Sequence, residues 1–176
     1  MIEEDILIVQ AKIDYAESYN KAVDTVARER KYLMTTEGFS IESTRSFVET
    51  IEKNNWAQFY AVKDGDVIGW CDILPKNFEG VRHVGTLGIG ILPEYRGTGL
   101  GSRLLERAIE HAKSQNGIEK VELEVFESNE NAVQFYLKHG FFQEGRRVKA
   151  RKLDGQYDNI ILMGKFIQNI PQIILF

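Results

Sequence analysis

A short glycine-rich segment between an apolar strand and a long amphipathic helix places the strongest constraint on the fold of this chain. Residues 84–92 have the alternating side chains of a strand, and residues 98–115 repeat apolar side chains at the spacing of one helical face. Another alternating strand is predicted over residues 121–126. A strand, a helix and a strand in this order form a crossover whose two strands run parallel. The chain therefore needs a sheet that contains at least this parallel pair.

The other predicted elements favour antiparallel neighbours. The dipeptides Asp64-Gly65 and Asp154-Gly155 can adopt the positive φ angles of tight hairpin turns. Strands are predicted over residues 6–13, 58–62, 67–74, 142–153 and 157–166, and helices over residues 15–32, 129–139 and from a cap at Ser40 or Ser43 to residue 53. We therefore expect an α+β (mixed α/β) fold with a central mixed, mostly antiparallel sheet of about seven strands and helices on both faces.

Composition and charge exclude several classes of protein. The 176 residues carry 22 basic and 26 acidic side chains, a formal net charge of −4 that disfavours coating of nucleic acid. The acidic residues 3–5 are unlike the basic start of a signal peptide, and no apolar run reaches the ~20 residues of a membrane span. The lone Cys71 cannot form an intrachain disulfide, and no Cys/His cluster has metal-binding spacing. We expect a cytoplasmic protein that binds no nucleic acid, membrane or metal.

The length fits a single domain, which we place at residues 1–166. Residues 167–176 form an apolar tail without charged side chains. A tail of this composition would be a liability if it were exposed. We therefore expect it to extend the last strand, to pack on its own subunit or to contribute to a homodimer.

The glycine-rich segment also predicts a site for an anion. Gly97, Gly99 and Gly101 allow the backbone to turn sharply and to gather N–H groups at the start of the predicted helix. The helix dipole and these N–H groups together favour a phosphate or a pyrophosphate, and Arg96 adds a positive charge at the rim. The segment has neither the Gly-Lys-Ser/Thr of a nucleoside triphosphate loop nor the G-x-G-x-x-G of a dinucleotide site.

The strand before this segment has one nearly bare face, formed by Thr86, Gly88 and Gly90. Such a face is typical of close approach by a ligand or another backbone, of a bulge, or of tight packing against a neighbour. The sequence alone does not separate these explanations.

A second motif, Asn129-x-x-Ala132-x-x-x-Tyr136-x-x-x-Gly140-Phe141, follows the next predicted strand. Combined with the Arg-x-x-Gly-x-Gly of residues 96–101, and in this order, it resembles the GNAT family of acetyl-CoA-dependent N-acetyltransferases over about residues 67–166. The resemblance implies a three-layer GNAT fold. It also implies direct transfer of an acetyl group from acetyl-CoA to a primary amine, which we expect to belong to a small molecule, without an acyl-enzyme and without a metal.

The resemblance further implies which residues hold the cofactor. The backbone from Gly97 to Gly101 would hold the pyrophosphate of coenzyme A beside Arg96, and the pantetheine arm would fill a gap between two strands. Asn129 matches an asparagine that caps the short helix and reaches the pantetheine, although capping alone would explain it. The residues assigned to cofactor binding are Ile89, Ile91, Leu92, Arg96, Gly97, Thr98, Gly99, Leu100, Gly101, Asn129, Ala132 and Tyr136.

Two residues are assigned to proton transfer. Tyr136 matches the family tyrosine that protonates the departing thiolate, and packing in the core is its simpler explanation. Many relatives have a glutamate where this chain has Gly88, so the base must come from elsewhere. We assign it to Glu122, which shares a strand face with Glu124, and a base acting through water is an equal alternative.

The acceptor contacts are predicted from the same resemblance. We assign them to Glu37 in the loop after the first helix, to Gly88, and to Tyr157 in the last hairpin, with Trp56 and Trp70 as candidate walls. Asn159 replaces an aspartate that close relatives often carry after the Asp-Gly turn, and this departure weakens the family's acceptor contacts here.

Two other functions compete with the acetyltransferase. A non-catalytic acyl-CoA-binding module is favoured by the missing glutamate at Gly88. A dinucleotide-dependent oxidoreductase is a weaker alternative, because Glu122 or Glu124 lies about where a ribose-binding acid would follow the glycine-rich segment.

Overall fold

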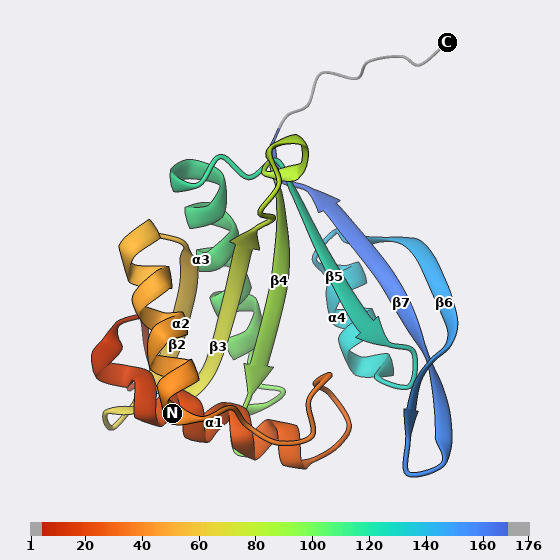
Figure 1. Ribbon diagram of the computed structural model, residues 1–176, viewed down its shortest axis with the longest axis horizontal. Helices are drawn as coiled ribbons and strands as arrows, with labels where there is room; N and C mark the ends of the chain where they lie inside the picture. The colour runs from red at the N-terminus through yellow and green to blue at the C-terminus, as the bar shows by residue number, and fades with distance from the viewer. Residues whose placement is uncertain (1–4, 169–176) are drawn as a thin grey trace.

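A seven-stranded sheet forms the middle layer of the computed structural model, which describes residues 5–168 (Figure 1). The strand order is β1-β2-β3-β4-β5-β7-β6, and only the β4–β5 pair is parallel. The strands are β1 (Leu7–Gln10), β2 (Ala57–Lys63), β3 (Asp66–Pro75), β4 (Val84–Ile91), β5 (Lys120–Phe126), β6 (Phe142–Leu153) and β7 (Gln156–Phe166). The predicted mixed, mostly antiparallel sheet with one parallel crossover is therefore confirmed.

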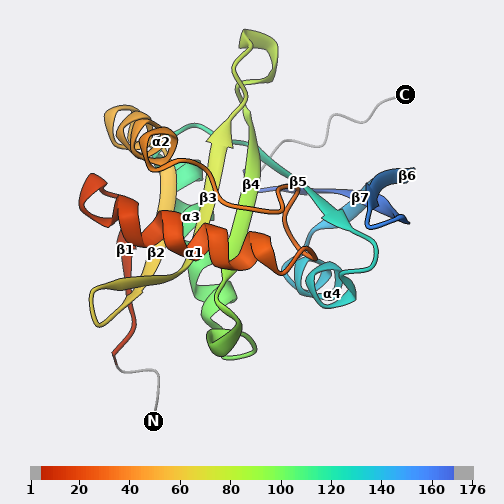
Figure 2. The ribbon, with the colours of Figure 1, turned by 60° about the horizontal axis from the view of Figure 1, so that its bottom comes forward.

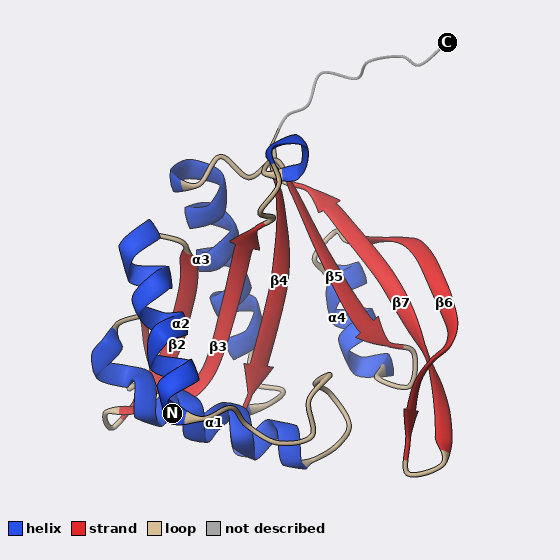
Figure 3. Ribbon diagram, in the orientation of Figure 1, coloured by secondary structure: helices blue, strands red, loops and turns tan. Residues whose placement is uncertain are grey.

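Four helices cover the two faces of the sheet (Figures 2 and 3). They are α1 (Ala16–Arg28), α2 (Ile41–Asn54), α3 (Leu100–Gln115) and α4 (Glu130–Lys138). Side chains of α1 and α2 share one buried apolar cluster, and side chains of α3 and α4 share the other. Alternate residues of β1, β2 and β3 enter opposite clusters, as Trp70 and Cys71 do in β3. This gives the three layers that the sequence predicts.

The two Asp-Gly turns and the cap of α2 form as the sequence predicts. Asp64 and Gly65 have φ angles of 52° and 87°, and Asp154 and Gly155 have 50° and 77°, so both Asp-Gly pairs form the predicted tight turns. Of the two candidate caps for α2, Ser40 takes the role, because its hydroxyl accepts a hydrogen bond of 3.1 Å from the Ser43 N–H.

The ends of three predicted elements differ from expectation. Helix α1 ends at Arg28 rather than at residue 32, and Arg30 has a φ of 59°, a left-handed conformation that the helix cannot continue through. Helix α3 begins at Leu100 because Gly99, with a φ of 84°, is its N-cap. Strand β1 is shorter than predicted, since a 3₁₀ turn at Ile13–Tyr15 follows it.

Strands β4 and β5 pair over only part of their length. Their register runs from Val84 opposite Lys120 to Thr86 opposite Glu122, and beyond this point the strands diverge (Figure 1). The antiparallel neighbours β3 and β7 continue to pair with them on their outer sides. The sheet therefore splits along its middle, between residues 87–91 of β4 and 123–126 of β5.

The first residue of the predicted tail, Ile167, lies within the described part of the chain. Ile167 is buried, and its N–H donates a hydrogen bond of 2.9 Å to the Glu119 carbonyl, so the chain continues to pack on its own sheet just after β7. The remaining tail residues, 169–176, lie outside the described residues. Within residues 5–168, no helix has the length and apolar character needed to cross a membrane.

Candidate active site

A cleft of about 690 Å³ lies where β4 and β5 diverge, which is a volume typical of cofactor and substrate sites. It brings together segments that are far apart in the sequence. Its walls come from β4 (Leu87, Gly88, Ile89, Gly90 and Ile91), the glycine-rich segment (Arg96, Gly97, Gly99, Gly101 and Ser102), β5 and the turn after it (Glu124, Val125, Phe126 and Asn129), α4 (Asn131, Ala132, Phe135, Tyr136 and Lys138), and α1 with its following loop (Val26, Tyr32, Leu33 and Met34).

The glycine-rich segment presents backbone N–H groups at one end of this cleft. The N–H groups of residues 97–102 donate to no acceptor within residues 5–168, because they precede the first helical hydrogen bond of α3. Gly97 and Gly99 have φ angles of 73° and 84°, and a Cβ atom built on either would meet nothing within 4 Å. Gly101 has a packing role instead, since its Cβ would lie 3.3 Å from Ile91 Cδ1 and 3.4 Å from the Phe135 ring. The arrangement is an anion cradle open to the cleft.

Arg96 holds the segment in place. Its guanidinium forms a two-pronged ion pair with Glu29 at 2.5 and 2.9 Å, and its Nε donates a hydrogen bond of 2.8 Å to the Ile91 carbonyl. The Tyr32 ring lies 4.7 Å from the guanidinium carbon. Arg96 lines the cleft, as predicted for the rim, but Glu29 neutralises much of its positive charge.

Three other residues assigned to the cofactor do not line the cleft. Leu100 is 2% exposed in the core, and Leu92 packs against both apolar clusters. The Thr98 hydroxyl donates a hydrogen bond of 2.8 Å to the Tyr95 carbonyl. These side chains shape the segment, whereas its contribution to the cleft is the backbone.

Asn129 and Ala132 lie at the start of α4, beside the cleft. The Asn129 side-chain oxygen accepts a hydrogen bond of 3.3 Å from the Ala132 N–H, so Asn129 caps this helix. Ile89 and Ile91 also line the cleft, from β4. A contact of any of these residues with a cofactor stays a prediction.

Tyr136 lines the cleft from α4 and is 7% exposed. Burial and, to a smaller degree, the nearby Cys71 thiol raise the pKa of its phenol above the ordinary value. The ring is held at its edges by Phe135 and Phe141, with centroids 5.4 and 5.6 Å away. At neutral pH the phenol is therefore protonated and oriented, which suits a hydrogen-bond donor or a general acid.

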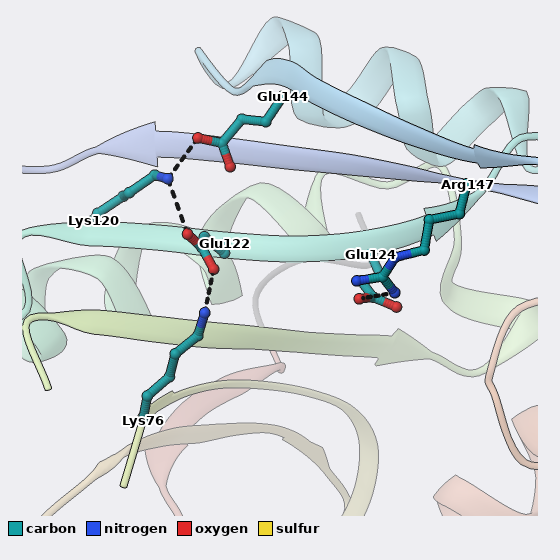
Figure 4. Close-up of polar contacts among 6 residues, drawn as sticks. All are labelled: Lys76, Lys120, Glu122, Glu124, Glu144 and Arg147. Atoms are coloured by element: carbon teal, nitrogen blue, oxygen red, sulfur yellow. Dashed lines mark hydrogen bonds and ion pairs between the residues drawn. The ribbon is translucent and has the colours of Figure 1, made fainter. Parts of the chain in front are cut away.

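Glu122 does not line the cleft. Its carboxylate pairs with Lys76 and, at 2.9 Å, with Lys120, which also pairs with Glu144 at 2.5 Å (Figure 4). Partial burial raises the pKa of Glu122, but the two lysines outweigh this effect and lower the pKa below its ordinary value. Such a carboxylate is a weak base. Glu124 does line the cleft, and its carboxylate pairs with Arg147 at 2.7 Å.

Side chains of β3 fill the bare face of β4. A Cβ atom at Gly90 would lie 2.2 Å from the Trp70 ring, which stands against this face. A Cβ atom at Gly88 would lie 3.1 and 3.3 Å from the two carboxylate oxygens of Asp72. At Gly90 the explanation is therefore tight packing. Gly88 lies on the cleft wall, with a carboxylate beside it.

The residues predicted to contact an acceptor are not brought together. Glu37 is exposed and does not line the cleft, which the same loop reaches instead through Tyr32, Leu33 and Met34. Tyr157 is 56% exposed on β7, with the ammonium groups of Lys149 and Lys152 5.3 and 5.2 Å from its ring centre.

The remaining candidates have packing roles. Trp70 is buried in the cluster beneath α1 and α2, and Trp56 packs against the same cluster. The Asn159 side chain accepts a hydrogen bond of 2.8 Å from the Lys149 N–H, where β6 departs from regular pairing.

Sequence reasoning missed Asp72 and the stretch 32–34. A signal for Asp72 was present, since it is a single acidic residue in the apolar strand 67–74. The Asp64-Gly65 turn sets the β2–β3 register, and only the further pairing of β3 with β4 puts Asp72 opposite Gly88.

The fold and the cleft together define a class: a three-layer α/β protein with a cleft between two diverging parallel strands, the first of which leads into a loop whose backbone N–H groups are unpaired within residues 5–168. A profile of the family described as "Acetyltransferase (GNAT) family" matches residues 24–141, most of the chain. The chain belongs to the GNAT family of acetyltransferases. The oxidoreductase alternative is therefore excluded.

Similar proteins agree with this assignment. The L-amino acid N-acetyltransferase AaaT of Escherichia coli (strain K12) is 31% identical over 108 residues, which cover 61% of this chain and 67% of that protein. An N-alpha-acetyltransferase of Sulfurisphaera tokodaii is 34% identical over 120 residues, covering 62% and 70%. The structure of yncA, a putative acetyltransferase from Salmonella typhimurium with its cofactor acetyl-CoA, has a TM-score of 0.87 and 15% identity, covering 96% of this chain and 97% of that one.

Proposed function

We propose that this protein transfers an acetyl group from acetyl-CoA directly to a primary amine of a small molecule. The observation that carries the proposal is the cradle of backbone N–H groups at residues 97–102, which opens into the cleft between β4 and β5. A cradle of this kind suits a pyrophosphate. The diverging strands leave backbone groups for an extended arm to pair with, at residues 87–91 of β4.

Acetyl-CoA supplies the acetyl group as a thioester, which a neutral amine can attack. The residues of this chain orient the reaction: the 97–102 backbone holds the pyrophosphate, and the buried Tyr136 phenol provides a proton for the departing sulfur. No acyl-enzyme is needed. Cys71, the single cysteine, is fully buried in the core, and burial raises the pKa of its thiol well above the ordinary value.

A small acceptor is favoured by the form of the cleft. Tyr32, Leu33 and Met34 add a wall to it from the loop after α1, and a walled cleft suits a single small amine better than the surface of a folded protein. The relatives differ in what their names give as the acceptor, an L-amino acid for one and an α-nitrogen for the other. The acceptor must therefore be found by experiment.

The test is a panel of amines with acetyl-CoA, in which thiol release is followed and the acetylated product is identified by mass. The panel contains L-amino acids, spermidine and a peptide with a free N-terminal alanine. Turnover of a free amino acid or spermidine in preference to the peptide supports the proposal. Preference for the peptide contradicts the small-molecule part, and binding of acetyl-CoA without any turnover indicates the acyl-CoA-binding module instead.

The Tyr136→Phe variant tests the acid role. It should lower kcat by about 10- to 1,000-fold, since proton transfer by a positioned side chain contributes about this much. The affinity for acetyl-CoA, measured by calorimetry, should stay within about twofold. The neighbouring Phe135→Leu is a packing control. Equal losses in both variants, with weaker acetyl-CoA binding, would mean that Tyr136 only packs.

We also propose that residues 1–166 form one domain and that the apolar tail extends the last strand, packs on its own subunit or contributes to a homodimer. Light scattering of the full chain and of a chain ending at residue 168 tests the homodimer. An unchanged mass and solubility after the deletion would contradict a role of the tail in assembly.

A further inference from the structure

A carboxylate beside the cleft has no place in the function described so far. Asp72 lies directly opposite Gly88 in the β3–β4 register. Its two carboxylate oxygens are 3.1 and 3.3 Å from the point that a Cβ atom of residue 88 would occupy, and its side chain is partly exposed. Gly88 lines the cleft and Asp72 does not, so this carboxylate stands next to a residue of the cleft wall that has no side chain of its own.

No cationic group neutralises Asp72 within residues 5–168. The titratable groups that its charge affects are the phenols of Tyr19 on α1 and Tyr60 on β2, and the thiol of its chain neighbour Cys71, which points to the opposite face. Gln58 lies opposite Asp72 in the β2–β3 register, and its Oε1 accepts a hydrogen bond of 3.1 Å from the Tyr60 hydroxyl. The pKa of Asp72 is raised to about 7 by burial, and Gln58 offsets part of the rise.

The two other carboxylates near the diverging strands are already paired. Glu122 pairs with two lysines outside the cleft, and Glu124 pairs with Arg147 at the cleft surface (Figure 4). An ion-paired carboxylate holds a proton poorly, which makes it a weak proton acceptor. Asp72 differs from both in having neutral surroundings.

Asp72 and Tyr136 lie on opposite faces of the sheet. Side chains of a strand alternate between the faces of the sheet, and Cys71 enters the same cluster as Tyr136, under α3 and α4. Asp72 therefore belongs to the opposite face, with Trp70 under α1 and α2.

We propose that Asp72 is the proton acceptor for the attacking amine, in place of a side chain at residue 88. The inference rests on the proposed acetyltransferase function. The N–C bond to the acetyl group forms, the C–S bond of the thioester breaks, Asp72 takes one proton from the amine nitrogen, and the sulfur takes one from Tyr136. A carboxylate that titrates near neutrality is matched to this task, because a substantial fraction of it is ionised at neutral pH and it still holds a proton firmly.

The experiment compares Asp72→Asn with the wild type on the panel amine that the wild type acetylates fastest. We expect kcat/KM for the amine to fall by about 100-fold or more, with the acetyl-CoA affinity from calorimetry within about twofold. The wild-type kcat/KM should rise with pH through an apparent pKa near 7, and this limb should be absent from the variant. Asp66→Asn, the same change at an exposed site on β3, is the matched control.

The outcomes separate the two proposals. A wild type that acetylates no amine overturns the function and, with it, the role of Asp72. A wild type that is active while Asp72→Asn keeps its rate and its pH profile overturns only the assignment of Asp72. If Glu122→Gln, and not Asp72→Asn, lost activity and the rise of kcat/KM with pH, the assignment would also be overturned, in favour of Glu122. Asp72→Glu, which keeps a carboxylate, should recover part of the activity if Asp72 is the base, and recovery no better than Asp72→Asn counts against it.

Discussion

The titration of Asp72 predicts a pH-dependent difference in stability between the wild type and Asp72→Asn. The folded protein raises the pKa of this carboxyl from 3.8 to about 7. A raised carboxyl pKa means that the unfolded chain loses the proton first, so stability decreases as pH rises from the unfolded pKa through the folded one. A shift of about three units at ~1.4 kcal/mol each corresponds to roughly 4 kcal/mol, an upper value because the side chain is partly exposed.

Asparagine has nearly the same shape and does not ionise, so the variant avoids this loss. Near pH 4 the two proteins should unfold at similar urea concentrations, and near about pH 8.5 the variant should be more stable by roughly 2–4 kcal/mol. Urea unfolding at both pH values measures the difference, with Asp66→Asn as the control for an exposed aspartate. If the stability difference between the variant and the wild type did not grow from about pH 4 to about pH 8.5, the neutral, desolvated environment inferred for Asp72 would be refuted.

Three further substitutions test the cradle, the cap and the core. Gly99→Ala, at a φ of 84°, should cost about 1 kcal/mol of backbone strain and raise the acetyl-CoA dissociation constant about tenfold in calorimetry, whereas unchanged affinity would mean that this backbone does not hold the ligand. Asn129→Ala removes the α4 cap and should lower the unfolding free energy by about 1 kcal/mol in urea. Asn131→Ala, the same change at a residue inside α4 that is not its cap, is the comparison. Leu104→Ala, at a fully buried site on α3, should cost about 3–5 kcal/mol in the same assay, and a loss below about 1 kcal/mol would contradict the packing there.

The parts of the fold that depend on local chemistry could be predicted from the sequence. The Asp-Gly turns, the Ser40 cap and the strand–glycine–helix crossover depend on residues that are neighbours along the chain. The cradle belongs to this group, because the glycines that form it are consecutive with the helix that it begins. The end of α1 was missed, since the left-handed Arg30 carries no glycine or proline signal.

The parts of the site that depend on strand register were not accessible. Asp72 and Gly88 meet only through the β3–β4 pairing, and Trp70 fills the space at Gly90 for the same reason. Glu122 has the right residue type on a suitable strand, but Lys76, which reaches it from the end of β3, could not be paired with it from the sequence. Predicting a base requires the charges around a carboxylate, and these come from several strands at once.

The divergence of β4 and β5 also has a mechanical consequence. Each strand is fully paired on one side, and on the other its terminal half faces a gap, so the sheet contains two inner edges. An extended ligand lying between them would act as a substitute strand that joins the halves of the sheet. Binding in the gap should therefore make the sheet more rigid. Slower amide hydrogen exchange at residues 87–91 on addition of coenzyme A would show both the binding and the loss of motion.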